Sequence, residues 1–212
     1  IAYFVDAYEK KELPHFFRAS AILALAAVVG VCVNISNLYH TYEYSKETMR
    51  GKSELKQEGP AANQTSSGLD RDYITNWSYG IGETLTLLVP NVKGGGCSTT
   101  LSQNETAMAK ANPMYGNLYS QLTPYFGDQP WTAGPVYVGA FVVFLFILGC
   151  FIVKGPLKWA LLGATIFSIL LSWGKNFMGL TDFFIDYIPM YNKFRAVSSI
   201  LVIAEFTIPL LA

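Results

Sequence analysis

The sequence has 212 residues, of which 51% are hydrophobic, 15% aromatic and only 14% charged. A soluble domain of this length carries about 25% charged residues, so the composition favours a chain that is largely in contact with lipid. The formal net charge is zero, and no basic block with interleaved aromatic residues occurs, which argues against a nucleic-acid partner.

The first predicted transmembrane helix covers residues 16–41. Its apolar core is long enough for a span, which needs about 20 residues. Lys10, Lys11 and Arg18 lie at its leading end, and the positive-inside rule places this end in the cytoplasm. We therefore expect residues 1–15 to be the end of an upstream helix followed by a cytoplasmic loop.

Residues 42–134 form the predicted extracytoplasmic loop. It opens with a polar segment at 44–59 that favours a helix, followed at 59–68 by a stretch rich in Gly, Ala, Asn and Ser that indicates mobile chain. The loop lacks the alternating apolar pattern of strands. We expect it to pack on the outer membrane face rather than to fold as a separate domain.

Residues 135–174 predict a transmembrane helical hairpin. Its two apolar runs are separated by a turn at 154–158, and the lysines and Gly-Pro pair there are typical of a tight cytoplasmic turn. Residues 175–195 carry aromatic side chains at helical spacing, which predicts an extracytoplasmic helix lying in the interface. Residues 196–212 predict the start of a further span. The expected fold class is mainly α, with polytopic transmembrane helices.

The most polar candidate site is the segment Asp70-Arg71-Asp72. Its carboxylates suit a general base or a metal site, and an equally good interpretation is a helix cap with a solvated salt bridge. Glu83 opens an apolar run too short to span a membrane. A structural acid favoured by a helix dipole is the preferred interpretation there, and a carboxylate beside a ligand is the alternative.

Lys193 and Arg195 precede the last apolar run on the predicted outer side, where basic residues depart from the positive-inside bias. They suit the phosphate of a lipid carrier, although ordinary snorkelling at a helix end is the alternative. Glu205 lies within the last apolar run and is expected to face a cavity or a partner helix. Asp182 and Asp186 are interpreted as solvated acids rather than as cation ligands.

Three segments, residues 66–91, 154–177 and 186–212, resemble the YfhO-like bacterial membrane proteins. The most specific part is Pro189 to Arg195, which is similar to a Pro…Lys-Phe-Arg element before a span. The resemblance implies an internal fragment of a glycosyltransferase of the membrane-embedded GT-C class, which uses polyprenyl-phosphate sugars at the outer side of the membrane.

The resemblance implies a multi-pass protein of the bacterial inner membrane. Its ligands would be membrane lipid and a polyprenyl-phosphate sugar, and its other partner the remainder of the same polypeptide. The general base of the class lies in its first outward loop, which is expected to precede this chain. Asp70, Asp72 and Glu83 are then the candidate catalytic, metal-binding or acceptor-side groups, with a divalent cation as the one cofactor considered. The candidate phosphate ligands are Arg71, Lys193 and Arg195. The alternative function is a non-enzymatic membrane subunit or a lipid or solute transporter.

Overall fold

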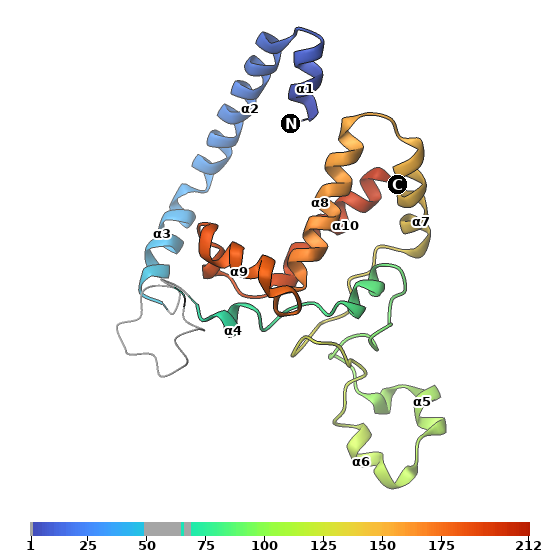
Figure 1. Cartoon of the computed structure of the whole chain (residues 1–212). Helices are drawn as coiled ribbons and strands as arrows, with labels where there is room; N and C mark the ends of the chain where they lie inside the picture. Colours follow the sequence, from blue (N-terminus) through green and yellow to red (C-terminus); the bar gives the residue numbers. More distant parts are fainter. Residues whose placement is uncertain (1, 49–64, 66–68) are drawn as a thin grey trace.

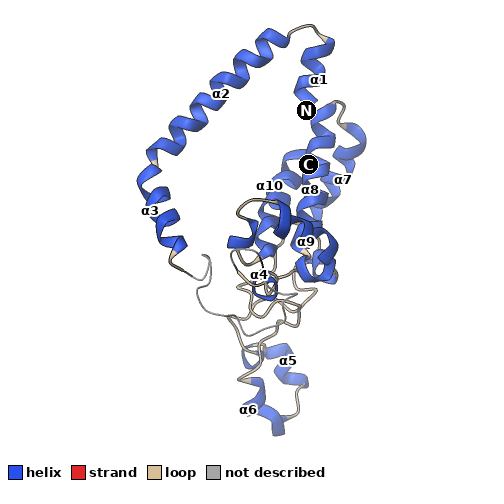
Figure 2. Cartoon of the chain, turned by 60° about the vertical axis from the view of Figure 1, so that its left-hand side comes forward, coloured by secondary structure: helices blue, strands red, loops and turns tan. Residues whose placement is uncertain are grey.

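The computed structural model describes residues 2–48, 65 and 69–212. These residues are mainly helical and include no strand (Figure 2), which confirms the prediction of a mainly α chain. The stretch predicted to be mobile lies outside the described residues except for Thr65. Most of the helix predicted over 44–59 lies outside them as well.

The N-terminal part is an arm of three helices, α1 (Ala2–Glu9), α2 (Leu13–Val33) and α3 (Ile35–Lys46), with a break at Asn34. The helical arm extends at both ends beyond the predicted span at 16–41. A proline in the first turn of α2 is compatible with a helix start, because its missing N–H has no partner there. α1 folds back from α2 and contacts α8 (Figure 1).

The C-terminal part is a bundle of α7 (Ala140–Ile152), α8 (Pro156–Ser172) and α10 (Val202–Leu211), with the 3-10 helix η7 (Val197–Leu201) leading into α10. α7 and α8 are joined by a short turn, as predicted, and α10 packs against both (Figure 1). α7 is shorter than the apolar run at 135–153, since the chain before it is irregular and Gly139 has a φ of 113°.

The helix α8 has mostly polar side chains among its buried residues, with Leu171 as the apolar exception, and large apolar side chains on its exposed face. Thr165, Ser168 and Ser172 are buried, and the Thr165 hydroxyl lies 2.7 Å from that of Thr207 on α10. Phe167 and Trp159 are exposed on the same helix. A helix of a soluble protein has the opposite pattern.

Among the described residues, α2 is the one helix long and apolar enough to cross a bilayer by itself. α8 meets that criterion only together with the following segment, η5 (Gly174–Phe177) and α9 (Met178–Tyr187), and the pair bends by 108°. α7 and the η7–α10 segment are apolar but shorter. The helix predicted within 175–195 is therefore present as α9, turned sharply away from α8.

The large loop consists of short helical turns. α4 (Arg71–Ile74) and the 3-10 helix η2 (Gly82–Leu87) contribute residues to the two buried apolar clusters beside the bundle. The segment around α5 (Glu105–Lys110) and α6 (Gly116–Tyr119) extends away from the bundle (Figure 1). The loop also contains the 3-10 turns η3 (Leu101–Gln103) and η4 (Pro113–Tyr115). A further 3-10 turn, η6 (Tyr191–Lys193), follows α9 outside the loop.

Candidate functional site

Arg71 joins the short helix α4 to α9. Its Nη1 donates to Asp182 and its Nη2 to Asp186, both at 2.6 Å, and the two carboxylates lie one turn apart on α9. The Asp70 side chain caps α4 by accepting the Asp72 N–H at 3.0 Å. The cap and the ion pairs match the structural interpretation of this segment, with Asp182 and Asp186 paired rather than only solvated.

Arg195 also reaches the segment around α4. Its Nη1 donates to Tyr73 Oη at 2.7 Å, and its guanidinium lies 4.5 Å from the centre of the Trp77 ring. The neighbouring Ala196 has a φ of 66°, a left-handed conformation that redirects the chain directly after the arginine. The structure thus brings Asp70, Arg71 and Arg195 into one region, although they are far apart in the sequence.

Glu83 lies in a different place, in a buried polar cluster of the loop. It is 2% exposed. Its Oε1 accepts from Tyr125 Oη at 2.5 Å, and its Oε2 accepts from the N–H groups of Gly80 and Asp128 at 2.7 and 3.4 Å. Burial and the hydrogen bond to Glu83 raise the pKa of Tyr125 above its ordinary value. These bonds make Glu83 the link between two parts of the loop.

The same cluster continues to the start of α9. Asn176 Nδ2 donates to Tyr79 O at 3.0 Å and to Asp128 Oδ2 at 3.1 Å, and Lys175 Nζ donates to Asp128 O. Gly174 permits the close approach of η5 to Ser78 in the loop, because a Cβ at position 174 would lie 2.1 Å from Ser78 Oγ. The sequence reasoning missed Tyr125, Asp128 and Asn176, and no spacing in the sequence marks them as partners.

A groove lies between α3 and the chain at 190–194. Its volume is about 440 Å³, and its walls are mostly apolar. Lys193 comes from the segment predicted to bind phosphate, and Lys46 comes from the end of α3. The groove is lined by Asn37, Leu38, Thr41, Tyr42, Ser45, Lys46, Met190, Lys193 and Phe194. The sequence reasoning missed Lys46. Its one signal in the sequence is its position in the tyrosine-rich segment that forms the end of α3.

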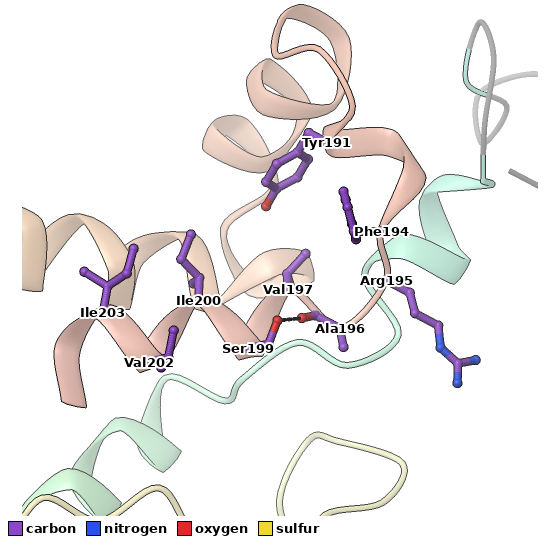
Figure 3. Close-up of a pocket in the computed structure, with 9 residues that line it drawn as sticks. All are labelled: Tyr191, Phe194, Arg195, Ala196, Val197, Ser199, Ile200, Val202 and Ile203. Atoms are coloured by element: carbon purple, nitrogen blue, oxygen red, sulfur yellow. Dashed lines mark hydrogen bonds between the residues drawn. The ribbon is translucent and has the colours of Figure 1, made fainter. Parts of the chain in front are cut away.

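A second cavity, of about 350 Å³, lies on the other side of Phe194. Figure 3 shows Tyr191 and Phe194 at one end and the aliphatic side chains of η7 and α10 along its length. Arg195 is among its lining residues, but its guanidinium points away from the others (Figure 3) and bonds to Tyr73 of α4. Burial raises the pKa of Tyr191 above its ordinary value. Phe194 is the residue that borders both the groove and this cavity.

Glu205 is exposed on α10, on a face that neither α7 nor α8 covers. In the part of the chain that the structure describes, it makes no hydrogen bond and no ion pair. It lines neither the groove nor the second cavity. A partner helix or a cavity for Glu205 therefore stays a prediction.

No group of three or more His, Cys, Asp or Glu side chains within residues 2–48, 65 and 69–212 is placed to hold a metal ion. Asp70 and Asp72 lie at α4, whereas Glu83 lies in the buried cluster with Tyr125, so these three carboxylates do not form one site. A divalent cation stays a prediction. The chain was compared with protein-family models, with curated proteins and with solved structures, and it matches none of them.

Proposed function

We propose that the chain is part of an integral membrane glycosyltransferase of the bacterial inner membrane. It would transfer a sugar from a polyprenyl-phosphate donor to a cell-envelope acceptor on the outer side. The resemblance to the YfhO-like proteins suggests this reaction. The groove between α3 and the chain at 190–194 supports it best, because it offers apolar walls and two lysines to a ligand with an apolar tail and a phosphate.

The distribution of apolar surface supports the membrane location. No residue of α2 is buried, and Leu23 on it is 72% exposed. In water such a continuous apolar surface would drive association, whereas in a bilayer it needs no cover. The polar buried face of α8 supports the same location, since interhelical hydrogen bonds such as Thr165–Thr207 are typical of packed membrane helices. We therefore propose that α2, α7, α8 and α10 are membrane helices of a polytopic protein.

The proposed reaction breaks the bond between the anomeric carbon and the donor phosphate oxygen while an acceptor hydroxyl attacks that carbon. A base takes the hydroxyl proton, and the polyprenyl phosphate leaves with the bonding electron pair. Positive charge near that phosphate stabilises the departing group. In our proposal Lys46 and Lys193 supply this charge, and the base lies in a part of the protein outside this chain.

Arg71 and Arg195 were predicted to bind the same phosphate. Each guanidinium now has protein partners, the two aspartates of α9 for Arg71 and the Tyr73–Trp77 pair for Arg195. Binding a phosphate would require them to leave these contacts, whereas Lys46 and Lys193 line the groove itself, Lys46 with its Nζ 4.6 Å from the centre of the Tyr42 ring. We propose instead that both arginines position α9 and the Lys193 segment around α4.

The test is the binding of undecaprenyl phosphate to the full-length protein in nanodiscs. Lys46→Ala and Lys193→Ala should each weaken binding about 10-fold, as expected for the loss of one hydrogen bond to a charged group. Lys154→Ala, at the turn between α7 and α8, is the matched control and should bind like the wild type. Equal affinity of all four proteins would refute the proposed phosphate site.

The transporter alternative makes a different prediction. Substrate sites of transporters lie near the middle of the membrane and are lined by polar groups. The clusters with charged side chains lie at the loop and around α4, the hydroxyl groups between α8 and α10 bond to one another, and the mostly apolar groove borders the end of α3. This arrangement favours the enzyme over the transporter.

A further inference from the structure

Phe194 lines both the lysine-bearing groove and the second cavity. It follows the 3-10 turn η6 directly, and its N–H donates to Tyr191 O at 3.3 Å. The side chain is 60% exposed although it lies between two apolar spaces. Figure 3 shows it beside Tyr191, at one end of the lining residues. An exposed aromatic ring between two apolar spaces can change its rotamer without breaking a packed core.

The second cavity suits a hydrocarbon tail. Val197, Ile200 and Ile203 provide aliphatic walls, and its polar surface is small. In a bilayer such a tail is already out of water, so its gain from the cavity is van der Waals packing against these side chains. Both spaces have volumes within the range of about 300–1,000 Å³ that is usual for small-molecule sites.

We propose that Phe194 determines tail specificity. The phosphate of an isoprenoid phosphate lies at Lys46 and Lys193, and its single tail passes Phe194 into the cavity formed by η7 and α10. This inference rests on the proposed function, because it takes the ligand class from it. The charge of the two lysines fits the phosphate, and the cavity that Phe194 borders takes the first part of one tail. A phospholipid with two tails would leave its second tail in the open groove.

The experiment compares two probes on the full-length protein in nanodiscs. Isopentenyl phosphate carries a single isoprenoid unit, whereas undecaprenyl phosphate carries a long tail that passes Phe194 in our proposal. Phe194→Trp should weaken undecaprenyl phosphate about 10-fold relative to isopentenyl phosphate, because the larger ring obstructs the passage. Phe194→Ala should raise the affinity for undecaprenyl phosphate relative to that for isopentenyl phosphate. Phe206→Trp, on an exposed aromatic residue of α10 outside both spaces, is the matched control.

A second measurement locates the tail directly. An undecaprenyl phosphate with a diazirine on its second isoprene unit should crosslink to Val197, Ile200 or Ile203 in the wild type and lose these crosslinks in Phe194→Trp. An unchanged affinity ratio in both Phe194 variants, or crosslinks confined to α3, would overturn the inference. Equal competition by dioleoyl phosphatidate would overturn the single-tail assignment.

The outcomes separate this inference from the proposed function. If Lys46→Ala and Lys193→Ala weaken both probes while the Phe194 variants change nothing, the phosphate site stands and the tail lies elsewhere. If the lysine variants leave the binding of both probes unchanged, the proposed phosphate site is refuted, whatever the result for the Phe194 variants.

Discussion

Replacing Glu83 by glutamine tests the packing of the outward loop. Both carboxylate oxygens of Glu83 accept hydrogen bonds, one from Tyr125 Oη and the other from two backbone N–H groups. A glutamine amide nitrogen only donates. Turned toward the backbone, it meets the N–H groups of Gly80 and Asp128. Turned toward Tyr125, the amide nitrogen cannot accept the tyrosine proton, which is left without an acceptor. The tyrosine oxygen already accepts from Gln129 N, so a second donor there gives it no substitute for the lost bond.

Either orientation leaves a buried polar group without its partner. We therefore expect Glu83→Gln to lower the free energy of local unfolding by about 1–3 kcal/mol. The assay is amide hydrogen exchange of Gly80 and Asp128 in the full-length protein, where this loss corresponds to exchange about 5- to 150-fold faster. Glu105→Gln, on the exposed first turn of α5, is the matched control.

A double-mutant cycle with Tyr125→Phe checks the assignment of the partner. Because Tyr125 and Glu83 are bonded directly, the two substitutions should be non-additive by about 1 kcal/mol or more. Unchanged protection of Gly80 and Asp128 in Glu83→Gln would refute the reasoning. Additive effects would show that the two side chains do not interact.

The remaining predictions concern pH, helix packing and topology. Below pH 10, the ordinary pKa of tyrosine, Tyr125 is protonated in both the folded and the unfolded state. Because its pKa is raised in the folded state, its stabilisation should be lost as the pH rises from 10 toward the folded-state value, and Tyr125→Phe should flatten the alkaline part of the unfolding curve. Gly149→Ala places a Cβ 2.2 Å from Leu211 O and should destabilise the contact of α7 with α10 by about 1–3 kcal/mol in thermal unfolding, whereas Gly163→Ala meets no atom within 4 Å and should not. In intact cells a membrane-impermeant maleimide should label Cys97 in the loop but not Cys32 in α2, and equal labelling would contradict the membrane assignment of α2.

Patterns in the sequence identified some residues of the candidate site but not the contacts that these residues make. The sequence singled out Arg71, Lys193 and Glu83 as polar groups beside apolar segments, and the structure places each of them in a defined contact or cavity. The sequence did not indicate the partners of these three residues. Arg71 bonds to aspartates more than 100 positions away, and Glu83 bonds to Tyr125, 42 positions later. No local spacing encodes such pairs, because they depend on how the chain returns on itself.

The sequence by itself determined that the chain is mainly helical. Uninterrupted apolar runs and Gly-Pro turns act locally, so they are readable without the tertiary structure. The tertiary structure alone decided the sharp bend between α8 and α9, the packing of α10 against both α7 and α8, and the position of Phe194 in the walls of both the groove and the cavity. The physical reason is that these features arise from close packing between distant segments, where a glycine such as Gly149 admits a neighbouring backbone.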